Sequence, residues 1–211
     1  MSRYTGPACK LCRREGVKLF LKGERCMKAK CAIDRERPAP GMDSRQRRPG
    51  KMSDYGVQLR AKQKIRRSYG ITEKQFRKIF ALASKKQGIT SFQLLALLEL
   101  RLDNVVYRLG FAPSRSAARQ AVTHGHIKVN GRKVNIASYT LRKDDVIELK
   151  KSDTSVAMVT KNLEAAESTN KLPEWITLEK DILNGLILRL PIEGEIQAAA
   201  DEQLVVELYS K

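Results

Sequence analysis

Four cysteines lie within the first 31 residues, and the chain contains no others. They form two pairs, with two residues between Cys9 and Cys12 and four between Cys26 and Cys31. Two short pairs can each form a turn that presents both sulfurs to one point, as a tetrahedral zinc site requires. Lysines and arginines flank both pairs, and nearby positive charge stabilises thiolates. The spacing therefore predicts a metal site held by Cys9, Cys12, Cys26 and Cys31.

Zinc is the metal that we expect, but a 4Fe-4S cluster also takes four cysteines, and the spacing leaves both open. Unligated thiols and a redox disulfide are the weaker interpretations. The first residues lack the apolar core of a signal peptide, which favours a reducing compartment and hence metal over disulfide. Since four protein ligands leave no open position on zinc, such a site is structural rather than catalytic.

Positive charge dominates the first two thirds of the chain. The 211 residues carry a net charge of +18. Residues 1–70 have 20 Lys and Arg against 6 Asp and Glu, residues 71–152 have 16 against 6, and residues 153–211 have 5 against 11. A basic chain with an acidic end points to a polyanion partner, and we expect nucleic acid. No apolar run is long enough to span a membrane.

The pattern of apolar residues predicts a mainly α fold with a small β part (α+β), behind an N-terminal region too polar to fold without metal or RNA. Ser53 or Asp54 can cap a helix that runs to about Arg67. Tyr55, Lys62, Lys64, Arg66 and Arg67 lie on it, and few acidic residues are nearby in sequence, which favours phosphate contact.

Further helix caps and a hairpin organise the rest of the chain. Thr72 and Thr90 each begin a capping box, the first for a helix that ends near Gln87 and the second for two abutting helices up to Gly110. Asn130-Gly131 between alternating residues is a strong hairpin signal. The other expected elements are a helix from Ser114 to Gly125, a strand at 146–149, a helix at 155–168, short strands within 174–190 and a last helix at 201–209.

The segment from Ser114 is a second candidate RNA surface. Arg115 and Arg119 are four residues apart and therefore share a helix face. The helix N-terminus offers backbone donors to phosphate. We expect this face to be extended, through the helix end and the hairpin, by His124, Lys128, Asn130 and Arg132. The two histidines have no nearby cysteine or carboxylate in sequence, so we interpret them as RNA-facing or hydrogen-bonded loop residues rather than metal ligands.

Residues 101–134 resemble the small RNA-binding domain named after ribosomal protein four of the small subunit. The similarity extends to the bacterial-type ribosomal protein family over close to the whole chain. It is carried by SRYTGP at the start, LCRREG around Cys12, SDYGVQLRAKQKIRRSYGI at 53–71, LLALLELRLDNVVYRLGF at 94–111 and VVELYSK at the end. Only some bacterial members of this family keep four N-terminal cysteines, and this chain is of that type.

The resemblance implies a metal-binding N-terminal region (1–45) and a helical domain (46–92) completed by 186–211. A small RNA-binding domain (93–185) is inserted between the two parts of the helical domain. Family members bind small-subunit rRNA directly and early in assembly of its five-prime domain. They touch a neighbouring small-subunit protein at an interface that affects decoding accuracy, and some repress their own mRNA. The resemblance places Arg47, Arg48 and Lys51 near the path along which mRNA enters.

We therefore expect a structural, non-enzymatic component of the small subunit in the bacterial cytoplasm, with no membrane contact and no homo-oligomer. Further rRNA contacts are expected from Arg3, Tyr4 and Arg14. The family often has Pro-Gly-Gln-His-Gly before its basic segment, whereas this chain reads Pro-Gly-Met-Asp-Ser at 40–44, so contacts of that Gln or His do not carry over.

Two other classes share the small RNA-binding domain. An RNA-modifying enzyme needs a catalytic domain of ordinary size, and no such length of chain is left over here. A free RNA chaperone has no use for the N-terminal cysteines and the matching C-terminus. A plastid-encoded ribosomal protein is also compatible with the motifs, although a bacterial origin is favoured.

Overall fold

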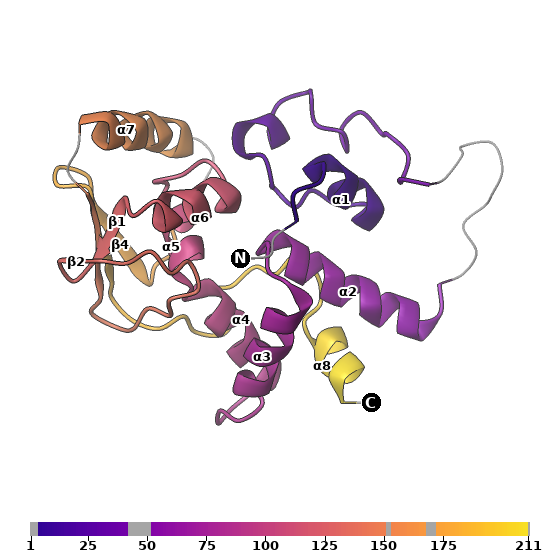
Figure 1. Ribbon diagram of the computed structural model, residues 1–211. Coiled ribbons are helices and arrows are strands. Elements are labelled where there is room, and N and C mark those ends of the chain that lie inside the picture. The colour runs from indigo at the N-terminus through magenta and orange to yellow at the C-terminus, as the bar shows by residue number, and fades with distance from the viewer. Residues whose placement is uncertain (1–3, 42–51, 151–152, 168–171, 211) are drawn as a thin grey trace. The chain divides into compact units, whose positions relative to one another are not determined.

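A computed structural model of the chain describes residues 4–41, 52–150, 153–167 and 172–210 (Figure 1). The chain divides into two compact units. Unit 1 comprises residues 1–95 and 197–211, and unit 2 comprises residues 96–196. The division falls within one helix, α4 (Thr90–Glu99). Within the described residues, no helix is long and apolar enough to cross a membrane.

Two of the helices of unit 1 begin at capping residues found in the sequence. Ser53 Oγ accepts a hydrogen bond from the Gly56 amide, and Thr72 Oγ1 accepts one from the Gln75 amide. The predicted helix from Ser53 is confirmed within a residue at each end. The helical elements of unit 1 are α1 (Ala8–Glu15), the 3₁₀ helix η1 (Gly23–Cys26), α2 (Asp54–Ser68), α3 (Glu73–Ala83), the first part of α4 and α8 (Gln203–Tyr209).

The prediction that the second helix extends to Gln87 is wrong, because α3 ends at Ala83. Residues 84–87 are all polar and exposed, so another helical turn would bury no apolar surface. Gly88 has a φ of 104°, which turns the chain before α4 begins.

The C-terminal helix completes the core of unit 1. Ile65 of α2, Phe76 of α3 and Val205 of α8 are fully buried. The Tyr209 ring lies 4.6 Å from the Phe80 ring and 6.2 Å from the Phe76 ring, measured between centroids. Residues more than a hundred positions apart therefore form one apolar cluster, and both ends of the chain belong to unit 1.

Unit 2 packs helices against a small antiparallel sheet. The remainder of α4 is followed by α5 (Leu102–Arg108), α6 (Arg115–Thr123) and α7 (Asp153–Glu167). The strand order is β2-β1-β3-β5-β4. The strands are β1 (Ile127–Val129), β2 (Arg132–Lys133), β3 (Val146–Leu149), β4 (Ile176–Glu179) and β5 (Asn184–Ile187).

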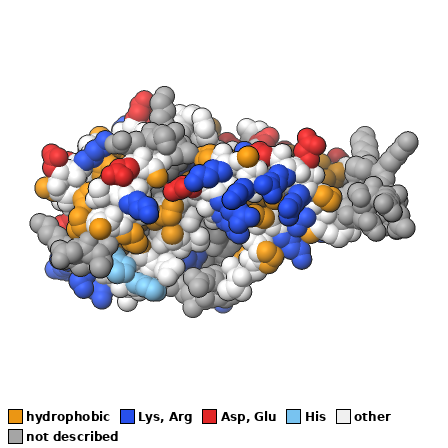
Figure 2. All heavy atoms as spheres, turned by 90° about the horizontal axis from the view of Figure 1, so that it is seen from above, with side chains coloured by type: hydrophobic (Ala, Val, Ile, Leu, Met, Phe, Trp, Pro, Cys, Tyr) orange, Lys and Arg blue, Asp and Glu red, His pale blue; other side chains and the backbone are white. Residues whose placement is uncertain are grey.

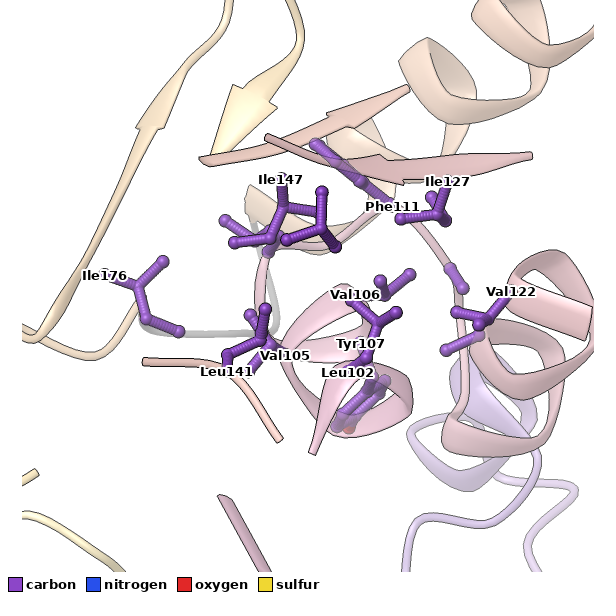
Figure 3. Packing of buried hydrophobic residues seen from close by; sticks show 14 of the residues in the cluster. Leu102, Val105, Val106, Tyr107, Phe111, Val122, Ile127, Leu141, Ile147 and Ile176 are labelled. Atoms are coloured by element: carbon purple, nitrogen blue, oxygen red, sulfur yellow. The ribbon is translucent and has the colours of Figure 1, made fainter. Parts of the chain in front are cut away.

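The core of unit 2 lies between these helices and the sheet. Figure 3 shows Leu102 and Val106 of α5, Val122 of α6, and Ile127 and Ile147 of the sheet directed toward a common centre. Trp175, the only tryptophan of the chain, is 1% exposed and belongs to the same cluster. Its fluorescence is therefore a reporter for the folding of unit 2.

The expected α+β fold is confirmed. The hairpin at Asn130-Gly131 and the strand at 146–149 are found as predicted, and α7 and α8 begin within two residues of the expected positions. The strands expected within 174–190 are β4 and β5. The domain boundaries at 45, 92 and 185 stay a prediction.

Candidate nucleic-acid interface and cysteine cluster

All four cysteines lie in the N-terminal segment of unit 1. Cys9 and Cys12 lie on α1, Cys26 ends η1, and Cys31 follows in a turn. Three of the thiols are buried and Cys9 is half-buried, and none forms a disulfide. The backbone amide of Lys22 donates to Cys26 Sγ at 3.4 Å.

Two of the four thiols have pKa values above the ordinary range for cysteine. Burial raises the pKa of Cys12, and the neighbouring Cys26, Cys9 and Cys31 raise it further. Burial also raises the pKa of Cys26, again with a contribution from Cys31 and Cys9. No group of three or more His, Cys, Asp or Glu side chains is arranged to hold a metal ion among the residues that the structure describes. The metal site therefore stays a prediction.

A buried carboxylate attaches the cysteine-bearing helix to α2. Glu15, the last residue of α1, has a fully buried side chain. Its Oε1 accepts hydrogen bonds from Arg67 Nη1 and, at 3.2 Å, from Arg60 Nη1. Burial lowers the pKa of the Arg67 guanidinium, and Glu15 opposes that shift. Arg67 was predicted to contact phosphate, and the structure uses it to position α1.

Two other predicted cations of α2, Lys62 and Arg66, are also engaged within unit 1. Lys62 Nζ donates to Glu73 Oε1 at 2.7 Å and lies 5.6 Å from the centre of the Tyr209 ring. Arg66 donates to the Gln63 side chain and to the Ile71 carbonyl. Lys64 is half-buried and forms no ion pair with any residue that the structure describes.

Glu73 organises this part of α2. Burial alone would raise its pKa, but hydrogen bonds from Lys62 and Tyr209 hold the pKa of Glu73 below its ordinary value. Tyr209 Oη donates to Glu73 Oε1 at 2.9 Å. Burial raises the pKa of Tyr209, and the adjacent carboxylate raises it further, so the phenol stays protonated as a donor. One carboxylate thus links α2, α3 and α8.

The predicted arginines of α6 lie beside a buried network in unit 2. Arg115 Nε donates to Asn104 Oδ1 at 2.7 Å, and its guanidinium is 4.7 Å from the centre of the Tyr107 ring. Asn104 in turn donates to Glu99, whose side chain is 1% exposed. Arg119 is 8% exposed. Substituting either arginine would therefore disturb the fold as well as any RNA contact.

The hairpin presents its cations differently. Lys128 of β1 lies directly opposite Lys133 of β2, and Arg132 beside it is exposed. An added Cβ at Gly125, two residues after the end of α6, would lie 2.0 Å from Lys133 Cε, so the Lys133 side chain packs against the chain just beyond that helix. The exposed His124 is next to it, with its ring 6.2 Å from that of His126. We call Lys128, Arg132, Lys133 and His124 the hairpin surface.

Asn130 has a structural task that the sequence did not reveal. Its side chain bonds to Asp145 and to the Val146 amide, so both of its polar atoms are engaged.

Tyr4, Arg14 and Tyr55 are exposed, as a contact with RNA requires. Arg3, Arg47, Arg48 and Lys51 lie outside the described residues, as do positions 42–44 of the divergent segment.

Figure 2 shows a large group of Lys and Arg side chains gathered together on the face in view. A smaller group lies close to the two pale-blue histidines. Exposed Lys and Arg of the cysteine segment are Lys10, Arg14, Lys22, Arg25, Lys28, Lys30, Arg35 and Arg37. Lys28 pairs with Glu24, with both side chains more than half exposed, and such pairs contribute little to stability.

Comparison with known proteins defines the class. Residues 3–99 match the family described as ribosomal protein S4/S9 N-terminal domain, and residues 100–147 match the S4 domain. These matches identify a ribosomal protein with an RNA-binding domain, in agreement with the basic surfaces of both units.

Full-length relatives give the family. The chain is 54% identical to small ribosomal subunit protein uS4 of Geobacter sulfurreducens. It is 52% identical to uS4 of Thermus thermophilus and to uS4A of Symbiobacterium thermophilum. Each alignment covers 100% of both chains. The chain therefore belongs to the bacterial uS4 family of small ribosomal subunit proteins, and it is a structural component rather than an enzyme.

The link between α1 and α2 can be tested by Glu15→Gln. Loss of the carboxylate leaves Arg60 and Arg67 without their shared buried anion, so the opening free energy of α1 should fall by roughly 1–3 kcal/mol. Hydrogen exchange of the amides in residues 8–15 of the full chain measures this change.

The matched control is Glu24→Gln, which removes an exposed carboxylate from the same segment. It should leave exchange in α1 almost unchanged. Equal exchange in α1 for the two variants would contradict the assigned role of Glu15.

Proposed function

We propose that this chain binds small-subunit rRNA through cations on both of its units and joins the five-prime domain of that RNA early in assembly. Family membership and the two RNA-binding family matches support the RNA partner. The hairpin surface and the exposed cations of the cysteine segment are the best candidates for contact among the described residues. Most contacts should go to phosphates and 2′-hydroxyls, since the major groove of A-form RNA is too narrow to be read by side chains.

The pairing of Lys128 with Lys133 is the observation that carries this proposal. Like charges directly opposite each other on neighbouring strands are destabilising. Glu148 lies opposite Lys128 on the other side and offsets one of the two charges. The remaining charge is increased by the exposed Arg132. A phosphate backbone bound along the hairpin would neutralise this excess positive charge. Within the isolated fold, the same charge does not stabilise the hairpin.

We also propose that this chain lies near the incoming mRNA and contributes to decoding accuracy, and this proposal rests on the family resemblance. Arg47, Arg48 and Lys51 are the residues that we propose for the mRNA path. A protein neighbour suits the acidic last third of the chain, where Ile182, Leu188, Leu190 and Ile192 are all exposed. Exposed apolar side chains in a segment of net negative charge favour protein over RNA as its partner.

We further propose that Cys9, Cys12, Cys26 and Cys31 hold one zinc ion. The donor set fits in kind and number, since four thiolates are a complete structural zinc shell. Their mutual effect on the pKa values of Cys12 and Cys26 supports proximity. Bound metal would relieve this repulsion between thiolates and would order a segment that has few apolar residues of its own. An iron–sulfur cluster remains the second candidate.

Lys128→Ala combined with Arg132→Ala should weaken binding of the full chain to small-subunit rRNA. Loss of two phosphate contacts should flatten the slope of log Kobs against log salt concentration by roughly 2. Titrations at several salt concentrations measure both quantities, and Trp175 fluorescence confirms that unit 2 is folded. This pair is a cleaner test than Arg115 and Arg119, which also make fold contacts.

Lys161→Ala combined with Lys180→Ala removes the same charge from exposed positions of unit 2 away from the hairpin in sequence. This control should keep the wild-type salt slope. Identical slopes for the two double variants would show that the hairpin surface is not a phosphate-binding site.

Metal analysis of small subunits prepared without chelator and under argon tests the cysteine proposal. We expect about one zinc per chain attributable to this protein, and its loss when Cys26→Ser and Cys31→Ser are combined. If the subunits instead contain iron with a matching amount of acid-labile sulfide, the four cysteines hold an iron–sulfur cluster rather than zinc. If the zinc content is the same with and without the two substitutions, the proposed metal site is contradicted.

A further inference from the structure

The turn between β1 and β2 is held onto the start of β3 by the backbone bond from the Asn130 amide to the Val146 carbonyl, at 2.9 Å, and by the Asn130 side chain. Asn130 Nδ2 donates to Asp145 Oδ1 at 2.8 Å, and Asn130 Oδ1 accepts from the Val146 amide at 2.8 Å. Asp145 is 9% exposed, and its other oxygen accepts from the Arg142 amide at 2.7 Å. We call the Asn130–Asp145–Val146 contacts the turn clamp.

The residue after Asn130 makes this amide chemically vulnerable. Gly131 has no side chain to shield its backbone nitrogen, which can attack Cγ of Asn130. The new N–C bond closes a cyclic imide while the bond from Cγ to Nδ2 breaks, and Nδ2 leaves as ammonia with the proton of the attacking amide. Water then opens the imide at either carbonyl, giving aspartate or isoaspartate. No oxidant or enzyme is required.

The fold opposes this reaction at position 130. Asn130 and Gly131 both have positive φ, 50° and 76°, as a tight two-residue turn requires. To reach the Gly131 nitrogen, the side-chain carbonyl must leave the Val146 amide, and Nδ2 must leave the Asp145 carboxylate. The second of these bonds is charge-assisted and therefore strong.

We propose that Asn130 is a fold-protected deamidation site, kept as asparagine by the turn clamp and modified in chains whose hairpin is open. The product cannot rebuild the clamp. An aspartate at this position offers no donor to Asp145 and places a second carboxylate beside it. An isoaspartate adds a methylene to the backbone of the turn and disturbs the register that sets Lys128 opposite Lys133. Deamidation thus marks chains that have been unfolded and removes the hairpin surface.

The chain contains its own comparison site. Asn184-Gly185 has the same two residue types, but it lies in β5, where the register pairs it with β3 on one side and β4 on the other. Asp145→Ala removes the acceptor of Asn130 Nδ2 and leaves those strand pairings in place. The two sites can be followed in one sample, so a local effect is distinguishable from unfolding of the whole unit.

The full chain is incubated at mildly alkaline pH, either folded or in urea, and both peptides are analysed by mass spectrometry with separation of isoaspartate. In folded wild type, both sites should react slowly, and urea should accelerate both. In folded Asp145→Ala, position 130 should react about tenfold faster than in wild type while position 184 stays slow. Gly131→Ala should slow the reaction at 130 in urea.

Folded wild type that deamidates at 130 as fast as the urea sample would overturn the proposal. An unchanged deamidation rate at position 130 in Asp145→Ala would also overturn it. Equal acceleration at positions 130 and 184 would overturn it as well, because it would indicate unfolding of the whole unit. Asp145→Asn, which keeps an oxygen to accept from Asn130 Nδ2, is the milder second variant, and its rate at 130 should lie between those of wild type and Asp145→Ala.

Discussion

The buried carboxylate of Glu99 is the interaction around which unit 2 is assembled. It accepts hydrogen bonds from Asn104 Nδ2 at 2.7 Å and from Arg108 at 2.7 and 2.9 Å, and Arg115 lies 4.0 Å away. These partners come from α5 and α6, so one anion fixes two helices against α4. Removing the Glu99 carboxylate would leave these cations without their buried anion and would strongly destabilise unit 2. The position of the hairpin that follows α6 depends on it.

Glu15 and Glu73 hold the helices of unit 1 together in the same way. Each accepts hydrogen bonds from side chains of distant segments, and each brings cations of α2 into fixed positions. A chain with a net charge of +18 thus folds around a few carboxylates that each have several partners. The cations divide into two classes as a result. Lys62, Arg67 and Arg115 hold the fold, whereas Lys128, Arg132 and the exposed residues of the cysteine segment are available to a polyanion.

Local signals in the sequence predicted most of the elements. The caps at Ser53, Thr72 and Ser114 depend on residues a few positions away, and Asn130-Gly131 defines its own turn, so short-range chemistry suffices. The end of α3 at Ala83 was missed because helix propensity at 84–87 is good, while burial, which decides the matter, is absent. The two-residue turn also fixes the strand register, which sets Lys128 opposite Lys133.

The candidate site was less accessible to sequence reasoning. The scarcity of acidic residues near α2 suggested phosphate partners for Lys62 and Arg67, but their carboxylates lie 11 and 52 positions away in the chain. Pairings over such separations are set by tertiary packing and have no local pattern. The clamp between Asn130 and Asp145 is another case, since the turn alone accounts for an asparagine at that position.

Lysine labelling with a small amine-reactive reagent tests the division of cations most directly, with the purified chain compared against the chain in intact small subunits. Lys62 should react poorly in both, because Glu73 and Tyr209 already engage it. Lys128 and Lys133 should react in the free chain and be protected in the subunit by rRNA. Equal labelling of Lys128 and Lys133 in the two states would contradict the account.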